Sequence, residues 1–93
     1  MELPVNYNEI HFTKRKLVRE EYIKIQKGKC YYCSQPLDKQ PCSSVRNRPI
    51  NWDLLPEHFL KYPIHLHHDH NTGMTIGAVH GYCNAVLWQY EGE

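Results

Sequence analysis

The sequence predicts a small α+β domain made of one helix, an irregular excursion, a short β-hairpin and a final short helix. A basic amphipathic segment covers residues 14–27, and residues 64–76 alternate weakly in polarity about an Asn-Thr-Gly turn. Two pairs of cysteine and histidine residues follow these segments. The chain has 93 residues, of which 41% are hydrophobic, so we expect one folded domain over residues 1–93 with a thin core.

The first helix is predicted over residues 14–27. Thr13 is a candidate N-cap and Gly28 a plausible C-terminal stop. Apolar side chains recur at helical spacing and predict one buried stripe. The stripe consists of Leu17, Val18, Tyr22 and Ile25.

Charge is concentrated around this helix. The whole chain carries a net charge of only +1, which does not by itself indicate a nucleic-acid partner. Residues 14–29, however, hold seven basic side chains against two acidic ones. Such a stripe can bind phosphates, or it can be an ordinary solvated helix face. The candidate phosphate contacts are Lys14, Arg15, Lys16, Arg19, Lys24, Lys27, Lys29 and, farther along, Arg46 and Arg48.

The second half of the chain predicts an insertion followed by a hairpin and a helix. Residues 34–63 contain five of the six prolines, which favours an irregular insertion with a short helix near residues 53–61. Residues 64–70 are predicted to form a strand, residues 71–73 a turn and residues 74–76 the returning strand. A final short helix or knuckle is expected from Gly77 onward.

Two pairs of ligand-type residues share one spacing. Cys30 and Cys33 form one pair, and His80 and Cys83 form the other. Two such knuckles supply the four tetrahedral ligands of a structural zinc ion. Cys42 competes for the fourth position, but it has no partner at this spacing and is interpreted as a free thiol. Disulfides or a redox pair would also use cysteines, but no export signal or βαβ context supports them.

A histidine cluster precedes the second pair. It comprises His65, His67, His68 and His70. On a strand, His65 and His67 face one side, and His68 and His70 the other. The cluster can be an exposed polar hairpin or an adventitious metal site. Its position between the two knuckles, with Asn84 directly after the last cysteine, points instead to a site that zinc would organise.

These motifs resemble the recombination endonuclease VII family, which belongs to the HNH, or ββα-metal, nucleases. Its members typically contain Asp-His-Asp-His, a Thr-Gly turn and a Gly-Leu-Leu-Cys-x-x-Cys-Asn knuckle followed by a leucine. Residues 67–73 and 77–87 are similar to this pattern, and residues 19–22 and 28–33 are similar to the family's first helix and knuckle. The resemblance extends over roughly residues 17–37 and 64–88. It implies a ββα-metal motif preceded by a basic helix.

The resemblance also implies an activity: divalent-metal-dependent hydrolysis of phosphodiester bonds in DNA. His68 would be the general base, and His67 and Asn84 would hold the catalytic cation, Mg²⁺ or Mn²⁺. Asp69 and His70 match further family positions and are expected to orient the hairpin or touch phosphate. Since His67 replaces the family's aspartate, Mn²⁺, Co²⁺ or Ni²⁺ could suit the site better than Mg²⁺.

Two other function classes remain open on the sequence. A non-catalytic zinc module that binds nucleic acid or protein would need no His68 or Asn84, and a redox or metal-storage protein would leave Asn84 unexplained. We expect DNA as partner, a monomer or homodimer, and neither a membrane nor a small-molecule substrate. The lack of an apolar leader predicts an intracellular protein. A bacterial origin, or a phage gene expressed in a bacterial host, is expected. Aromatic residues that could stack on bases, or simply pack, are Tyr31, Tyr32 and Trp52.

Overall fold

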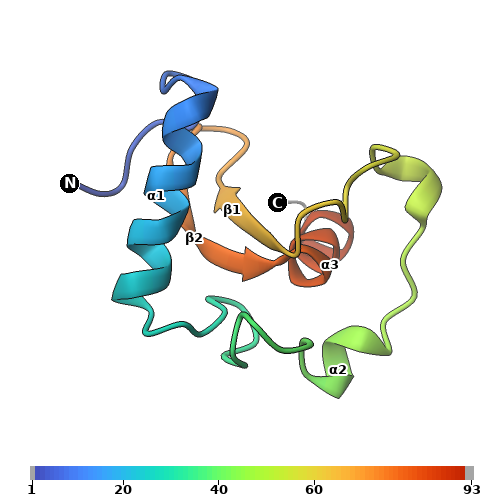
Figure 1. The fold of residues 1–93 in the computed structure, drawn as a ribbon. Helices are drawn as coiled ribbons and strands as arrows, with labels where there is room; N and C mark the ends of the chain where they lie inside the picture. The colour runs from blue at the N-terminus through green and yellow to red at the C-terminus, as the bar shows by residue number, and fades with distance from the viewer. Residues whose placement is uncertain (1, 92–93) are drawn as a thin grey trace.

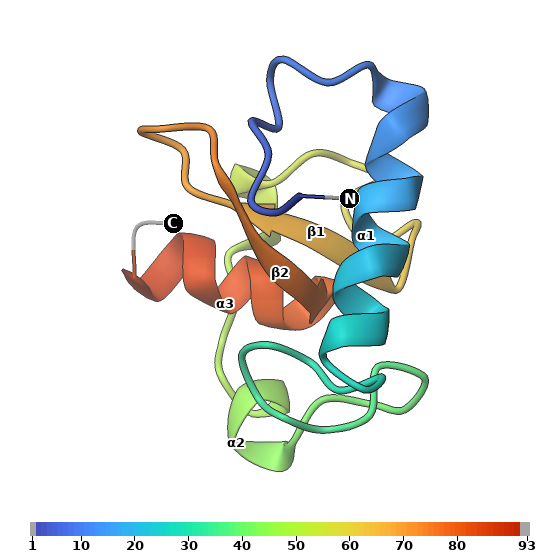
Figure 2. The ribbon, with the colours of Figure 1, turned by 90° about the vertical axis from the view of Figure 1, so that its left-hand side faces the viewer.

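The computed structural model describes residues 2–91 and has the predicted small α+β fold (Figure 1). The hairpin lies between the first and last helices and contacts both, and the short second helix packs on the last one (Figure 2). No helix among the described residues is both long and apolar enough to cross a membrane. The elements are α1 (Phe12–Ile25), α2 (Ser43–Arg46), the 3-10 turn η1 (Trp52–Leu54), β1 (Ile64–His68), β2 (Thr75–His80) and α3 (Gly81–Glu91).

Helix α1 begins earlier than predicted. The N-cap is His11, whose Nδ1 accepts the backbone N–H of Thr13 at 3.3 Å, so the prediction of Thr13 as the cap was wrong. The helix ends at Ile25, and the backbone then turns through a left-handed Lys27 (φ 57°). The N–H of Gly28 donates to the Ile23 carbonyl at 2.9 Å, which closes the last turn.

The apolar stripe of α1 is narrower than predicted. Val18 and Tyr22 are buried against the hairpin, and the Tyr22 hydroxyl lies 2.9 Å from Thr75 Oγ1. Leu17 and Ile25 are instead 48% and 60% exposed. The buried part of the stripe therefore spans about one helical turn, and it faces a two-stranded sheet.

Strands β1 and β2 are antiparallel, with Ile64 opposite His80. The register shifts after His67, so that Ile76 is an extra residue in β2. Strand β1 ends at His68, before the predicted end at residue 70, and β2 continues to His80, well beyond the predicted residue 76. Residues 77–80 extend β2 because they pair with residues 64–67, and α3 accordingly starts at Gly81 rather than at Gly77.

The hairpin turn is organised by Asp69. Its Oδ1 accepts the backbone N–H groups of Asn71 at 2.7 Å and Thr72 at 3.1 Å, and these bonds lower the pKa of the carboxyl group. Gly73 adopts a positive φ of 80°, and a Cβ there would lie 2.7 Å from Asn6 Oδ1. The turn therefore depends on both an aspartate and a glycine.

Two other segments hydrogen bond to β2. The N-terminal segment approaches from one end, where the Thr75 N–H donates to the Val5 carbonyl at 2.9 Å. At the other end, the Gln26 side chain accepts from the Ala78 N–H and donates to the Ala78 carbonyl, each at 2.9 Å. These bonds tie β2 to the segments on both sides of α1.

The insertion over residues 34–63 is irregular, as predicted, and docks on α3. The helix predicted near residues 53–61 is reduced to η1, since Pro56 holds Leu55 in an extended conformation. Asn51 and Pro49 hydrogen bond to Gln89 and Tyr90. The Tyr82 hydroxyl donates to two insertion carbonyls, those of Arg46 at 3.2 Å and Arg48 at 2.9 Å.

Candidate metal centre and adjoining pocket

The four predicted zinc ligands meet at one point. The ligand atoms of Cys30, Cys33, His80 and Cys83 all lie within 4.8 Å of one another. His80 Nδ1 is 3.4 Å from Cys33 Sγ and 3.6 Å from Cys83 Sγ. Ordinary Zn–N and Zn–S bond lengths in a tetrahedron give a nitrogen–sulfur separation of about 3.6 Å. The donor set therefore fits a structural zinc ion, and the predicted Cys3His cluster is confirmed.

The imidazole of His80 is held in an orientation that suits metal binding. Its Nε2 lies 2.9 Å from the Pro36 carbonyl oxygen, to which it donates. The Nδ1 lone pair is then left to face the sulfur atoms. A backbone carbonyl on the other nitrogen is a usual way in which a metal-ligating histidine is held.

The thiols of the cluster are electrostatically linked. A hydrogen bond from Cys83 lowers the pKa of the Cys30 thiol to about 4, whereas this bond and burial raise the pKa of Cys83. All four cysteines are free thiols. Cys42 lies outside the cluster with its sulfur 3.1 Å from Ser44 Oγ, which agrees with its predicted role as an unligated thiol.

The cluster adjoins the hairpin. The backbone N–H of Tyr31, between the first two ligands, donates to the Ala78 carbonyl at 3.0 Å. Cys83 lies in the first turn of α3, and Asn84 follows it directly. A bound metal would therefore fix the position of Asn84 relative to β1.

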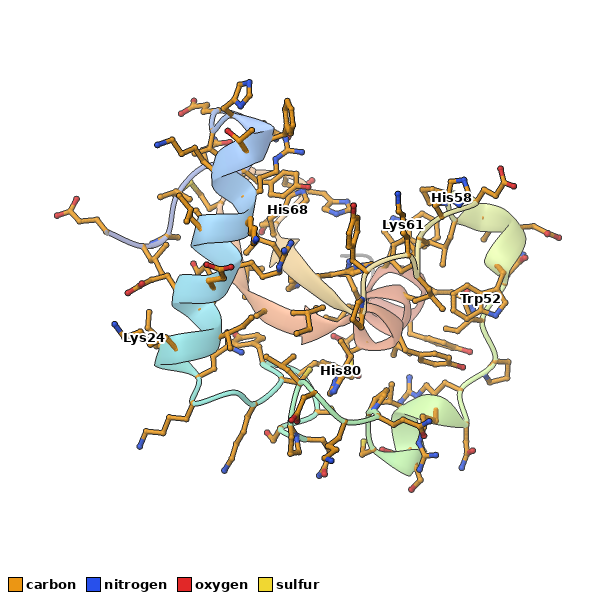
Figure 3. The ribbon with its side chains drawn as sticks, in the orientation of Figure 1. Lys24, Trp52, His58, Lys61, His68 and His80 are labelled. Carbon is orange, nitrogen blue, oxygen red and sulfur yellow. The ribbon has the colours of Figure 1, made fainter. Side chains whose placement is uncertain are left out.

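A hollow of about 590 Å³ lies between α1, β1 and the segment 59–62. His68 and Asn84, two of the predicted catalytic residues, both line it, and Arg15, Lys16 and Arg19 of α1 form another part of its wall. A smaller hollow of about 280 Å³ is also lined by His68 and Asn84, together with residues that include His70 and Trp88. In Figure 3, His68 lies between α1 and the loop that carries His58 and Lys61, while His80 lies on the side of the first knuckle.

His68 is held in a stack of planar groups. Its ring lies 3.9 Å from the Tyr7 ring at an interplanar angle of 4°, and the Arg15 guanidinium also lies over the Tyr7 ring, 3.9 Å from its centroid. Burial, and then the nearby His70 ring at 4.9 Å, lower the pKa of His68. The lowered pKa favours the neutral imidazole at neutral pH, in which one ring nitrogen can accept a proton.

The other two histidines of β1 occupy different surroundings. His67 is buried, at 2% exposure, and does not line either hollow. His65, to which the sequence assigned no role, lines the larger hollow, and its Nδ1 lies 3.1 Å from Asn84 Nδ2. Strand alternation gave no signal for this grouping, because it pairs His65 with His67, whereas the hollow contains His65 and His68.

The predicted phosphate-binding residues lie in different parts of the structure, and only some of them are near the hollow. Three of them, Arg15, Lys16 and Arg19, line the hollow. Lys24 extends from the opposite end of α1 (Figure 3). Two residues of the insertion interact elsewhere, Arg46 with Gln40 at 3.1 Å and Arg48 over the ring of Tyr90 at 5.0 Å. The remaining three, Lys14, Lys27 and Lys29, are exposed.

The aromatic residues of the hollow differ from those considered on the sequence. Trp52 packs edge-on against Tyr82 at 5.6 Å, and Tyr31 is an exposed residue of the first knuckle. The aromatic side chains that line the hollow come from three separate segments, so local sequence patterns carried no signal for this grouping. They are Tyr7, Phe12, Phe59 and Tyr62.

Comparison with known proteins gives no family for this chain. No family model matches it, and neither a curated protein nor a solved structure matches it.

Proposed function

We propose that this chain is a divalent-metal-dependent DNA endonuclease of the HNH, or ββα-metal, type. The observation that carries the proposal is that His68 and Asn84 line the same two hollows. The order of strand, strand and helix beside a Cys3His cluster supports it as well.

In the proposed reaction, His68 is the general base. A neutral imidazole accepts a proton from the water that attacks phosphorus, and such help is typically worth ~10²–10⁴-fold in rate. The ring stack with Tyr7 keeps the base in one orientation. Since burial lowers the pKa of His68, its reactive neutral form persists to a lower pH than that of an ordinary histidine.

Asn84 supplies an oxygen ligand for a catalytic cation at the wall of the hollow. A bound Mg²⁺ or Mn²⁺ supplies charge neutralisation for the phosphate oxygens and the leaving oxygen. His67 is the second ligand that the family resemblance implies. His67 is buried and lines neither hollow, so its role as a ligand rests on the resemblance alone.

The walls of the hollow suit a nucleic-acid strand. Arg15, Lys16 and Arg19 would contact backbone phosphates, which gives affinity without sequence preference. Phe12 and Tyr62 are 69% and 61% exposed and offer flat apolar surfaces to sugars or bases. A basic wall beside a general base suits phosphodiester cleavage, because it stabilises negative charge where the reaction develops it.

A plasmid-cleavage assay with the zinc-loaded protein tests the proposal. Supercoiled DNA should be nicked or cut only after Mg²⁺ or Mn²⁺ is added. His68→Ala should lower the rate by at least ~10²-fold with zinc content unchanged. His58→Ala, at an exposed histidine of the insertion, is the matched control and should cut normally. DNA binding by the wild-type protein without cleavage under any cation would identify a non-catalytic zinc module instead.

A further inference from the structure

The hydrogen bond between His65 and Asn84 joins β1 to the first turn of α3. His65 Nδ1 lies 3.1 Å from Asn84 Nδ2, and both side chains line the larger hollow. Asn84 directly follows a ligand of the metal cluster. The bond therefore connects the residue proposed to bind the catalytic cation with a histidine that the proposed mechanism does not use.

The His65 ring is also close to the segment that carries Phe59 and Tyr62. Burial lowers the pKa of His65 overall, although the backbone groups of Phe59 and Tyr62 act to raise it, and the Phe59 ring packs edge-on at 4.7 Å. His65 Nε2 and the Tyr62 carbonyl oxygen crowd the same space, 3.0 Å and 3.3 Å from where a Cβ on Gly81 would lie. The Asn84 NH₂ group can only donate, so its contact with His65 Nδ1 requires a neutral ring in which Nε2 carries the proton and the Nδ1 lone pair accepts.

This tautomer determines which way the Asn84 amide points. An asparagine amide has one oxygen and one NH₂ group, and only the oxygen can bind a cation. Because Nδ1 of His65 can only accept, it selects the rotamer in which the NH₂ group of Asn84 faces His65. The Asn84 oxygen is then directed away from His65.

We propose that His65 is a positioning residue that orients the Asn84 amide so that its oxygen is presented to the catalytic cation. The inference rests on the proposed function, since it assumes a cation at Asn84. Partners that orient metal ligands in this way typically contribute 10–100-fold in metal affinity.

Mn²⁺ titration of the zinc-loaded protein, followed by electron paramagnetic resonance, measures cation binding without reference to cleavage. We expect His65→Leu to weaken Mn²⁺ binding by ~10–100-fold. His65→Asn retains an oxygen acceptor near the position of Nδ1. Its Mn²⁺ affinity should stay within about threefold of the wild-type value, a much smaller change than the ~10–100-fold loss expected when the orienting partner is removed. His65→Gln places its polar atoms near the position of Nε2 and should bind as weakly as the Leu variant. Zinc content and the thermal midpoint report whether each variant is folded, and the Asn and Gln variants carry the test if the Leu variant does not fold.

The same His65→Leu substitution in a protein that also carries Asn84→Asp shows whether His65 orients Asn84 or only stabilises the fold. A carboxylate presents an oxygen in either orientation, so a protein that carries Asn84→Asp needs no orienting partner. In that background, His65→Leu should change the Mn²⁺ affinity by less than about threefold, because the orienting contribution is already absent. An equal loss of affinity with and without the Asn84→Asp substitution would overturn the inference. A wild-type protein that binds zinc but no Mn²⁺ would overturn the proposed function and the inference with it.

Discussion

Removal of the Tyr7 ring should destabilise the fold and loosen the proposed general base. The Tyr7 ring contacts both the His68 imidazole and the Arg15 guanidinium, each at 3.9 Å from its centroid. Its backbone N–H also donates to the Gly73 carbonyl at 2.7 Å, but that bond is independent of the side chain. Tyr7→Ala therefore removes the two ring contacts and leaves the backbone connection in place.

The expected magnitude follows from these two contacts. A stacked ring pair contributes about 0.5–1.5 kcal/mol beyond its buried area, and a cation–π contact at a partly exposed site about 0.5–1 kcal/mol. Together they give a loss of about 1–2.5 kcal/mol in the free energy of unfolding, to which the lost buried area of the ring adds. For a domain of this size, each kcal/mol lowers the thermal midpoint by about 4–8 °C.

Thermal unfolding of the zinc-loaded protein measures the loss, with Tyr7→Phe as the matched control because it keeps both ring contacts. Plasmid cleavage should fall by roughly tenfold to 10²-fold in Tyr7→Ala, since a displaced base loses its alignment. If the Ala and Phe variants unfold at the same temperature, the stack does not contribute to stability. If they cleave at the same rate, it does not position His68.

Three further perturbations test the cluster and the basic wall. Removal of the metal with a chelator should unfold the chain cooperatively, because zinc-binding free energy in small domains is also folding free energy; circular dichroism that is unchanged by the chelator would contradict this. Iodoacetamide should modify Cys42 alone in the zinc-loaded protein and all four cysteines after chelation, as counted by mass spectrometry. Arg19→Gln should weaken DNA binding at low salt and reduce its salt dependence, whereas Lys24→Gln, at the other end of α1, should have the smaller effect in the same titration.

The metal cluster could be predicted from the sequence because its information is local. Each knuckle places two ligands three residues apart, and four ligand-type residues leave few ways to complete a tetrahedron. The small α+β fold could be predicted for a similar reason, since turn residues and periodicity mark a hairpin and a helix. The spacing could not define the extent of β2, which depends on pairing with β1.

The surroundings of the proposed catalytic residues could not be predicted, because they depend on contacts between distant segments. Nothing near Tyr7 in the sequence indicates that its ring stacks on His68. The histidine cluster offered four similar candidates, and only the packing distinguishes the buried His67, the stacked His68 and the Asn84-bonded His65. Strand alternation assigns a face, but it does not determine which side chain reaches the hollow.

The hydrogen bonds that Val5 and Gln26 make to β2 also affect how two copies of this chain can associate. An unpaired strand edge is a template for pairing with another molecule and a route to aggregation. Here the backbone groups of Thr75 and Ala78 are already engaged by the chain's own N-terminal segment and by a glutamine amide. A continuous intermolecular sheet across these positions of β2 is thereby blocked, and any homodimer must form through another surface.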